Sequence, residues 1–274
     1  MPKYLTGSKK INLYSDIIHK ENKKEKPQSL AIVNDSVFFK NDTVKQVLTD
    51  TAKSTATKIN YKSGELDLTR FFEALHNHEN ENGKIRIAWF GDSMIEGDLV
   101  TQDFRKLMQK IYGGSGVGFV PVTSPVAQFR QTIRQTFSDD WEVYSFMKKP
   151  KQNYKLGIGG YSFVSSKGSW VDYKASRFYP VYSEVKMICR QCPPKSFILN
   201  EDTSLVFPVD SIGSFKEVEL IRNNPIKEVK LTFKKPNCEV HGLYFDKGNG
   251  VYVDNFSFRG NSGIPLSNIP FGEL

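Results

Sequence analysis

A serine at the end of a short apolar run has the placement of a nucleophile. Residues 85–90 are rich in β-branched and aromatic side chains and predict a buried strand, which stops at the tripeptide Gly-Asp-Ser of residues 91–93. Apolar residues then recur at helical spacing over residues 99–111, which predicts a helix. A serine at the carboxyl end of a central strand lies where open α/β sheets carry their chemistry, and a backbone N–H near a helix start can face a developing oxyanion. Ser93 could therefore attack a carbonyl group, and the competing hypothesis is a plain helix cap.

The residues around Ser93 resemble the first sequence block of the SGNH (GDSL-type) hydrolases. The match is Trp-Phe-Gly-Asp-Ser-Met over residues 89–94, and together with the glycine-rich residues 113–121 it is similar to bacterial envelope proteins related to peptidoglycan O-acetylesterases. The resemblance implies that Ser93 is the nucleophile and that its own N–H helps to form the oxyanion hole. A second block, an Asn/Ser-rich turn ending in glycine, is matched by residues 259–263 and implies a second oxyanion N–H from Gly263.

Two later blocks of that family, Gly-x-Asn-Asp and a C-terminal Asp-x-x-His, have no counterpart downstream of Ser93. The histidines are His19, His76, His78 and His241, and His19, the one with an aspartate three residues earlier, lies on the N-terminal side of the serine. The resemblance thus implies a nucleophile without its general base, as in the front half of a hydrolase with a C-terminal continuation. Because a serine without a base is a poor nucleophile at neutral pH, we expect this chain alone to be inactive or nearly so.

The composition indicates a globular protein of one large or two medium domains. Of its 274 residues, 39% are hydrophobic and 13% aromatic. The net charge is +8, but basic and acidic residues are interspersed, so we expect a glycan or an anionic cell-wall polymer as partner instead of a nucleic acid. No run reaches the ~18 apolar residues of a membrane span, and residues 1–10 lack a signal-peptide core. We expect no cofactor and a periplasmic or cell-envelope location, with the signal segment removed.

Changes in composition divide the chain into four segments. Short alternating or aromatic runs between Pro and Gly turns fill residues 126–250, and some eight strands at this spacing predict a β-sandwich. The expected organisation is an N-terminal arm over 1–68, the first part of an SGNH α/β domain over 69–125, the inserted sandwich over 126–250, and a return strand with the second SGNH block over 251–274. The expected fold class is therefore α/β: an incomplete, flavodoxin-like SGNH portion interrupted by a β-sandwich.

The resemblance extends to the sandwich, which is similar to a carbohydrate-binding module. Trp141, Trp170 and Tyr173 could form a sugar-stacking face there, and ordinary buried core aromatics are the alternative. The glycine-rich residues 113–118 superficially suggest a phosphate cradle. They lack the Lys-Ser/Thr of a P-loop and follow a helix instead of opening one, so we interpret them as a plain loop.

Three cysteines and a histidine have the spacing of a zinc site, Cys189-x-x-Cys192 with Cys238-x-x-His241. However, Cys192 precedes two prolines, and His241 alternates within a predicted strand, so it would point away from the neighbouring Val240. We expect a disulfide or free thiols in place of a metal, with one thiol unpaired because the number is odd.

Two functions remain open at this point. The first is a serine esterase that removes O-acyl or O-acetyl groups from peptidoglycan or another carbohydrate. The second is a non-catalytic glycan-binding or scaffold protein of the cell envelope, in which Ser93 is a relic.

Overall fold

The computed structural model describes residues 68–78, 83–149, 154–202, 213–264 and 266. All of them belong to one unit that spans residues 65–274. Except for Leu68, the expected N-terminal arm lies outside the described residues. No helix in the described part of the chain is long and apolar enough to cross a membrane.

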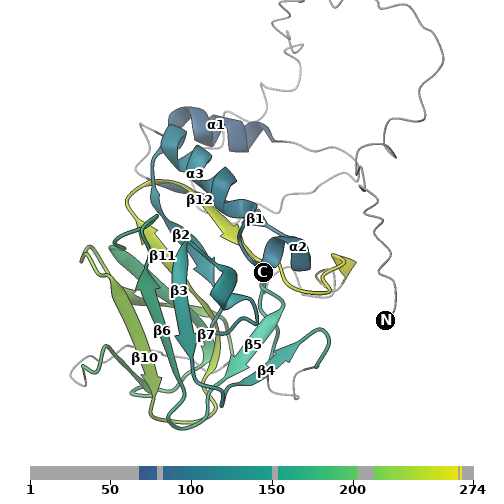
Figure 1. Ribbon diagram of the computed structural model, residues 1–274, viewed down its shortest axis with the longest axis vertical. Coiled ribbons are helices and arrows are strands. Elements are labelled where there is room, and N and C mark those ends of the chain that lie inside the picture. The colour runs from purple at the N-terminus through teal and green to yellow at the C-terminus, as the bar shows by residue number, and fades with distance from the viewer. Residues whose placement is uncertain (1–67, 79–82, 150–153, 203–212, 265, 267–274) are drawn as a thin grey trace, which may run out of the picture. The chain divides into compact units, whose positions relative to one another are not determined.

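A small βα unit positions the Ser93 turn, as the sequence predicts (Figure 1). Strand β1 (Lys84–Trp89) pairs in parallel with β12 (Gly250–Asn255), the return strand, over its whole length. The helices are α1 (Thr69–Asn77), α2 (Ser93–Glu96) and α3 (Thr101–Tyr112), and a 3₁₀ turn, η2, covers Ala127–Phe129. Helix α3 packs on β12, where the guanidinium Nε of Arg105 donates to the carbonyl of Val253 at 2.9 Å.

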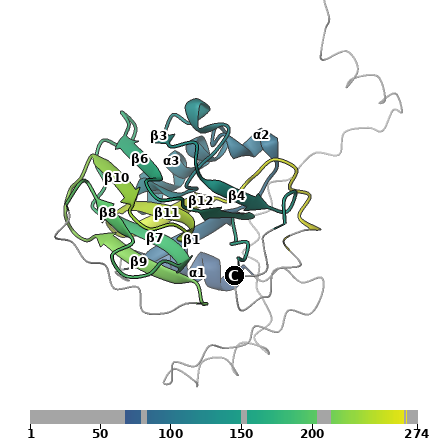
Figure 2. The ribbon, with the colours of Figure 1, turned by 90° about the horizontal axis from the view of Figure 1, so that it is seen from below.

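The remaining strands form two antiparallel sheets. The four-stranded sheet has the order β3 (Ile133–Phe137), β6 (Trp170–Ala175), β10 (Glu228–Phe233) and β8 (Phe197–Leu199). The larger sheet has the order β4 (Glu142–Ser145), β5 (Tyr161–Val164), β11 (Glu239–Lys247), β7 (Glu184–Gln191) and β9 (Lys216–Ile221), and β2 (Ser115–Val120) also pairs with β11. Figure 2 shows the two sheets as neighbouring layers.

The hydrophobic core lies between these two sheets. On β10 the alternate residues Val229, Leu231 and Phe233 are fully buried, and Met187 of β7 and Phe245 of β11 are buried from the other side. This alternation is what a strand with one face on a core requires. The expected β-sandwich is therefore present in the described residues.

The expected flavodoxin-like α/β fold is wrong. The described residues are mostly β-strand, and β1–β12 is the one parallel pair among them. The apolar run at 85–90 and the helix after it do form a βα unit. However, the next strand, β2, turns antiparallel onto β11 instead of extending the parallel sheet.

The plain loop expected at residues 113–118 is also wrong, because most of it is β2. A Cβ atom on Gly118 would lie 2.2 Å from Asp254 Oδ1, and one on Gly116 would lie 2.3 Å from the carbonyl oxygen of Phe245. Both glycines have positive φ angles, of 66° and 134°. Glycine is needed here because the strand runs too close to its neighbours for a side chain, and glycine is a poor strand signal.

Candidate active site

Ser93 lies where the sequence predicts, just beyond the carboxyl end of β1. It is the first residue of the short helix α2, and it is exposed. Asp92 is the cap of this helix, and its side chain accepts the N–H of Met94 at 2.9 Å. The Ser93 N–H has no hydrogen-bond partner among the described residues, as expected for the first turn of a helix. Asp92, not Ser93, is thus the cap, and Ser93 presents both its hydroxyl group and a free N–H.

The return segment after β12 holds this turn in place. The Phe256 N–H donates to the carbonyl of Trp89 at 2.9 Å, and the Phe258 N–H donates to the carbonyl of Gly91 at 3.1 Å. The Asn261 side chain donates to the same Gly91 oxygen at 3.2 Å. The two sequence blocks that resemble SGNH hydrolases therefore contact each other, although 170 residues separate Gly91 from Asn261.

Gly263 does not present the free N–H that the resemblance implies. It lies two residues after Asn261 in this same turn, with φ of 80°, and it is exposed. Its N–H donates to Asn261 Oδ1 at 2.9 Å. An oxyanion role for Gly263 would require this internal bond to be exchanged for one to the substrate.

A buried ion cluster supports α3 behind the turn. Arg105 donates two hydrogen bonds to the carboxylate of Asp98, at 2.9 and 2.8 Å, and Thr132 Oγ1 donates another at 2.8 Å. Burial alone would raise the pKa of Asp98, but the charges of Arg105 and Arg130 outweigh it and hold the pKa well below its usual range. Asp98 is therefore a fully paired carboxylate that joins the end of the Ser93 turn to α3 and β3.

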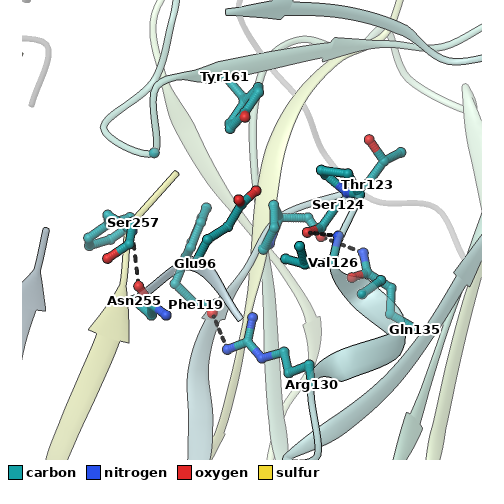
Figure 3. Close-up of a pocket in the computed structure, with 15 residues that line it drawn as sticks. Glu96, Phe119, Thr123, Ser124, Val126, Arg130, Gln135, Tyr161, Asn255 and Ser257 are labelled. Atoms are coloured by element: carbon teal, nitrogen blue, oxygen red, sulfur yellow. Dashed lines mark hydrogen bonds between the residues drawn. The ribbon is translucent and has the colours of Figure 1, made fainter. Parts of the chain in front are cut away.

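A small pocket, partly open to solvent, lies beside α2 (Figure 3). Its lining comes from α2, the return segment and the sandwich, and includes Glu96, Phe119, Val126, Tyr161, Phe256 and Ser257. The Glu96 carboxyl group points across this pocket toward Tyr161. Its cavity volume of about 30 Å³ has room for about two water molecules. We call it the Glu96 pocket.

Glu96 is buried without the partners that Asp98 has. Its side chain is 5% exposed, and its Oε2 atom has no hydrogen-bond partner among the described residues. Its nearest cation is Arg259, whose Nε lies 3.6 Å from Oε2. Burial raises the pKa of Glu96, and Arg259 only partly opposes this. Sequence reasoning missed both carboxyl groups, because nothing in the run from 92 to 98 distinguishes exposed from buried acids.

Within the described residues, no histidine contacts Ser93. His76 lies in the last turn of α1, and His78 just after it contacts the ring of Tyr112. His241 is buried, and its Nδ1 lies 3.0 Å from the carbonyl oxygen of Tyr161. Burial lowers the pKa of His241 to about 4. A neutral, enclosed imidazole of this kind packs the sheet and does not serve Ser93.

The sugar-stacking face expected for the sandwich is wrong in two of its three residues. Trp141 is 7% exposed and packs edge-on against Phe233 of the core. Tyr173 is 1% exposed, and its hydroxyl group donates to the carbonyl of Pro121. Trp170 alone is partly exposed, and it lines an open hollow on the outer side of the four-stranded sheet. The pattern of alternation misled here, because strand aromatics supply the core from both sheets.

The cysteines and His241 do not converge on one point. Cys189, Cys192 and Cys238 are buried free thiols in the core, while His241 faces Tyr161 and Phe215. Among the described residues, no group of three or more His, Cys, Asp or Glu side chains could hold a metal ion. Of the two expectations for the thiols, the structure has them free.

Comparison with solved structures relates the fold to an esterase. A peptidoglycan O-acetylesterase structure matches with a TM-score of 0.58 and 16% sequence identity, over 72% of this chain and 53% of that one. At this identity the likeness shows the fold alone, and the chain spans about half the length of that protein. CsCBM6-3 from Clostridium stercorarium in complex with cellobiose matches at 16% identity over 42% of this chain and 93% of that one, with a TM-score of 0.27 that supports no argument. No family model and no curated protein matches the chain.

Proposed function

We propose that this protein belongs to the enzymes that remove O-acyl groups from a cell-wall glycan, with Ser93 as the nucleophile. The observation that carries the proposal is the Ser93 turn, which presents an exposed hydroxyl group beside an N–H that has no partner in the described part of the chain. The return segment holds this turn through two hydrogen bonds on Gly91. The likeness to a peptidoglycan O-acetylesterase fold supports the same class. Such a substrate lies in the cell envelope, so we place the protein there or outside the cell.

The geometry supplies part of an acyl-transfer site. The Ser93 oxygen would attack the ester carbonyl carbon, and the negative charge that forms on the carbonyl oxygen would be met by the Ser93 N–H. Collapse of this intermediate would release the sugar hydroxyl group and leave the acyl group on Ser93, to be hydrolysed by water. The proton of Ser93 needs an acceptor, which no described contact supplies. We propose that a His-Asp pair from a C-terminal continuation of the protein provides it.

A glycan-binding protein without catalysis is the second candidate. It is favoured by the hollow on the four-stranded sheet, where the ring of Trp170 lies beside Asp172 and Lys230. An aromatic ring flanked by polar groups suits a sugar, because one face of a pyranose is apolar and its edge carries hydroxyl groups.

Acetate release from O-acetylated peptidoglycan tests the first candidate. In a protein that carries the proposed His-Asp pair, we expect Ser93→Ala to lower the rate by roughly 10³-fold or more, because the nucleophile is lost. The matched control is Ser183→Ala at a half-buried serine before β7, whose hydroxyl group has no hydrogen-bond partner among the described residues, and it should leave the rate unchanged. In the 274-residue chain alone, we expect only a trace of Ser93-dependent p-nitrophenyl acetate hydrolysis. An unchanged rate in Ser93→Ala, with glycan binding retained, would favour the second candidate instead.

A further inference from the structure

Two buried cysteines flank the paired ends of strands β7 and β11 in the larger sheet. Strand β7 ends at Gln191 and β11 begins at Glu239, and these two residues are register partners in the antiparallel ladder. Cys192 follows the first and Cys238 precedes the second, so the same register places the two cysteines directly opposite each other. Both side chains belong to the hydrophobic core. Opposite residues of an antiparallel pair share a face and have Cα atoms roughly 4.5–5.5 Å apart.

Contacts around this pair hold it in position. The Cys238 N–H donates to Ser165 Oγ at 3.1 Å, and the Cys238 carbonyl accepts the Ser165 N–H at 3.0 Å. A hydrogen bond from the Cys192 thiol lowers the pKa of the Cys238 thiol to about 7, although burial opposes this. Hydrogen bonds with Cys189 and Cys238 raise the pKa of Cys192. Cys238 is therefore the thiol that ionises first, and the thiolate is the form that attacks a disulfide.

The third cysteine, Cys189, lies further along the ladder. Its register partner is Val240, two residues beyond Cys238 on β11. Cys189 and Cys192 lie on one strand three residues apart, which is about 10 Å in a regular strand. The register shift between Glu239 and Val240 shortens this separation only locally. A disulfide needs Cα atoms roughly 4.4–6.8 Å apart, and the directly opposite pair is the one that meets this requirement without movement of the backbone.

We propose that Cys192 and Cys238 form a disulfide when the protein meets a disulfide oxidant, and that Cys189 remains a free thiol. Such an oxidant, a small-molecule or protein disulfide, belongs to an oxidising compartment. The Cys238 thiolate attacks one sulfur of the oxidant and releases the other as a thiolate, which leaves a mixed disulfide on Cys238. Cys192 then loses its proton and attacks the Cys238 sulfur, which releases the second thiolate. The protein loses two electrons and two protons, and the oxidant leaves as two thiols.

The pair lies close to the surface although both side chains are buried. Pro193 and Pro194 after Cys192 are exposed, as are residues 234–237 before Cys238. A local opening of these two segments would therefore admit an oxidant. The bond would close a loop of about 45 residues, which restricts the unfolded chain and stabilises the fold. It lies in the sandwich, so its presence does not depend on the proposed esterase activity.

Peptide mapping tests the pairing in the whole chain, refolded with oxidised and reduced glutathione and alkylated before digestion. Trypsin cleaves after Arg190, Lys195 and Lys234, whereas Pro236 protects the bond after Lys235. Each cysteine thus falls in its own peptide, 187–190, 191–195 or 235–247. We expect the second and third peptides to be linked and Cys189 to be alkylated. Three alkylated cysteines, or a link that involves the peptide of Cys189, would overturn the proposal.

Melting temperatures with and without a phosphine reductant test the same bond through stability. In the wild type we expect reduction to lower the melting temperature by roughly 5–15 °C. Cys192→Ala should abolish this response, and the matched control Cys189→Ala should retain it. Each variant is compared with itself, so the loss of a buried side chain does not affect the comparison. A response that survives in Cys192→Ala, or that disappears in Cys189→Ala, would contradict the pairing.

Discussion

Glu96 and Asp98 lie two residues apart and both have buried side chains, yet their environments are opposite. Asp98 accepts hydrogen bonds from Arg105 and Thr132, and its pKa is lowered. The Oε2 atom of Glu96 accepts none among the described residues, and burial raises the pKa of this residue. Asp98 is fully hydrogen-bonded and stabilises the fold, whereas Glu96 has an ion pair with Arg259 at 3.6 Å and no hydrogen bond on its Oε2 atom among the described residues. This contrast assigns a structural role to Asp98 that Glu96 does not share.

The structural role of Asp98 can be tested by Asp98→Asn. The substitution keeps the shape but leaves the buried guanidinium of Arg105 without its counter-charge, so we expect a loss of roughly 3–5 kcal/mol in the free energy of unfolding. Urea denaturation at pH 7 measures it. Asp103→Asn, on the exposed side of the first turn of α3, is the control and should cost less than about 1 kcal/mol. A small and equal effect of both substitutions would show that the cluster does not stabilise the fold.

At the scale of elements, local patterns predict the strands and helices but not their neighbours. The strand expected over 85–90 and the helix over 99–111 correspond to β1 and α3. Strand β2 was missed because its glycines are a poor strand signal. The flavodoxin-like fold was wrong because the pairing of β2 with β11 depends on a close approach to Asp254 that no local pattern contains.

In the candidate site, too, local patterns predict the position of a residue but not its tertiary neighbours. The position of Ser93 after a strand follows from periodicity, and the contact of Gly91 with the second block follows from the resemblance. The Glu96 pocket could not be predicted, because Ser257 and Tyr161 come from distant parts of the chain and their free hydrogen-bond capacity is set by tertiary packing. Which carboxyl group is paired depends on where Arg105 points from α3.

The junction of β12 with the chain after α3 provides a test at this scale. Gly250 begins β12 with φ of 128°, and a Cβ atom there would lie 2.1 Å from the carbonyl carbon of Gly113. We expect Gly250→Ala to lower the free energy of unfolding by roughly 2–5 kcal/mol, from backbone strain and overpacking together. Gly248→Ala is the control, because its φ of 77° is similarly unusual but nothing lies within 4 Å of the added atom. It should cost only about 1–2 kcal/mol. Equal losses would show that packing at this junction is loose.

At the scale of the whole molecule, the Glu96 pocket joins parts that the sequence assigned to different segments. Phe119 comes from β2, Tyr161 from β5 of the sandwich, and Ser257 from the return segment. The sandwich thus contributes a wall of the pocket beside Ser93, whatever its outer face binds. Damage to the sandwich core should therefore disturb the candidate site as well as the stability of the fold.

The stability of the whole molecule should depend on pH through His241. The folded pKa, about 4, lies below the usual value of 6.5, so the unfolded chain takes up the proton first as the pH falls. This contribution is absent above pH 6.5 and destabilises the folded state progressively between pH 6.5 and about 4, by about 3 kcal/mol in total. Glu239, 3.7 Å from the ring, has a raised pKa and acts in the opposite direction, so wild-type stability alone does not isolate the histidine.

The difference in the free energy of unfolding between wild type and His241→Gln isolates the contribution of the histidine. Glutamine retains a side-chain donor for the carbonyl of Tyr161 but does not titrate, so its stability relative to the wild type should improve by about 3 kcal/mol as the pH falls from 7 to 4. Urea denaturation at several pH values measures this, and His76→Gln, in the last turn of α1, is the control with no expected change. A constant difference across this range would show that His241 takes up its proton in the folded protein. In that case the imidazole would be accessible enough to exchange protons with a bound substrate, and it would have to be reconsidered as the base for Ser93.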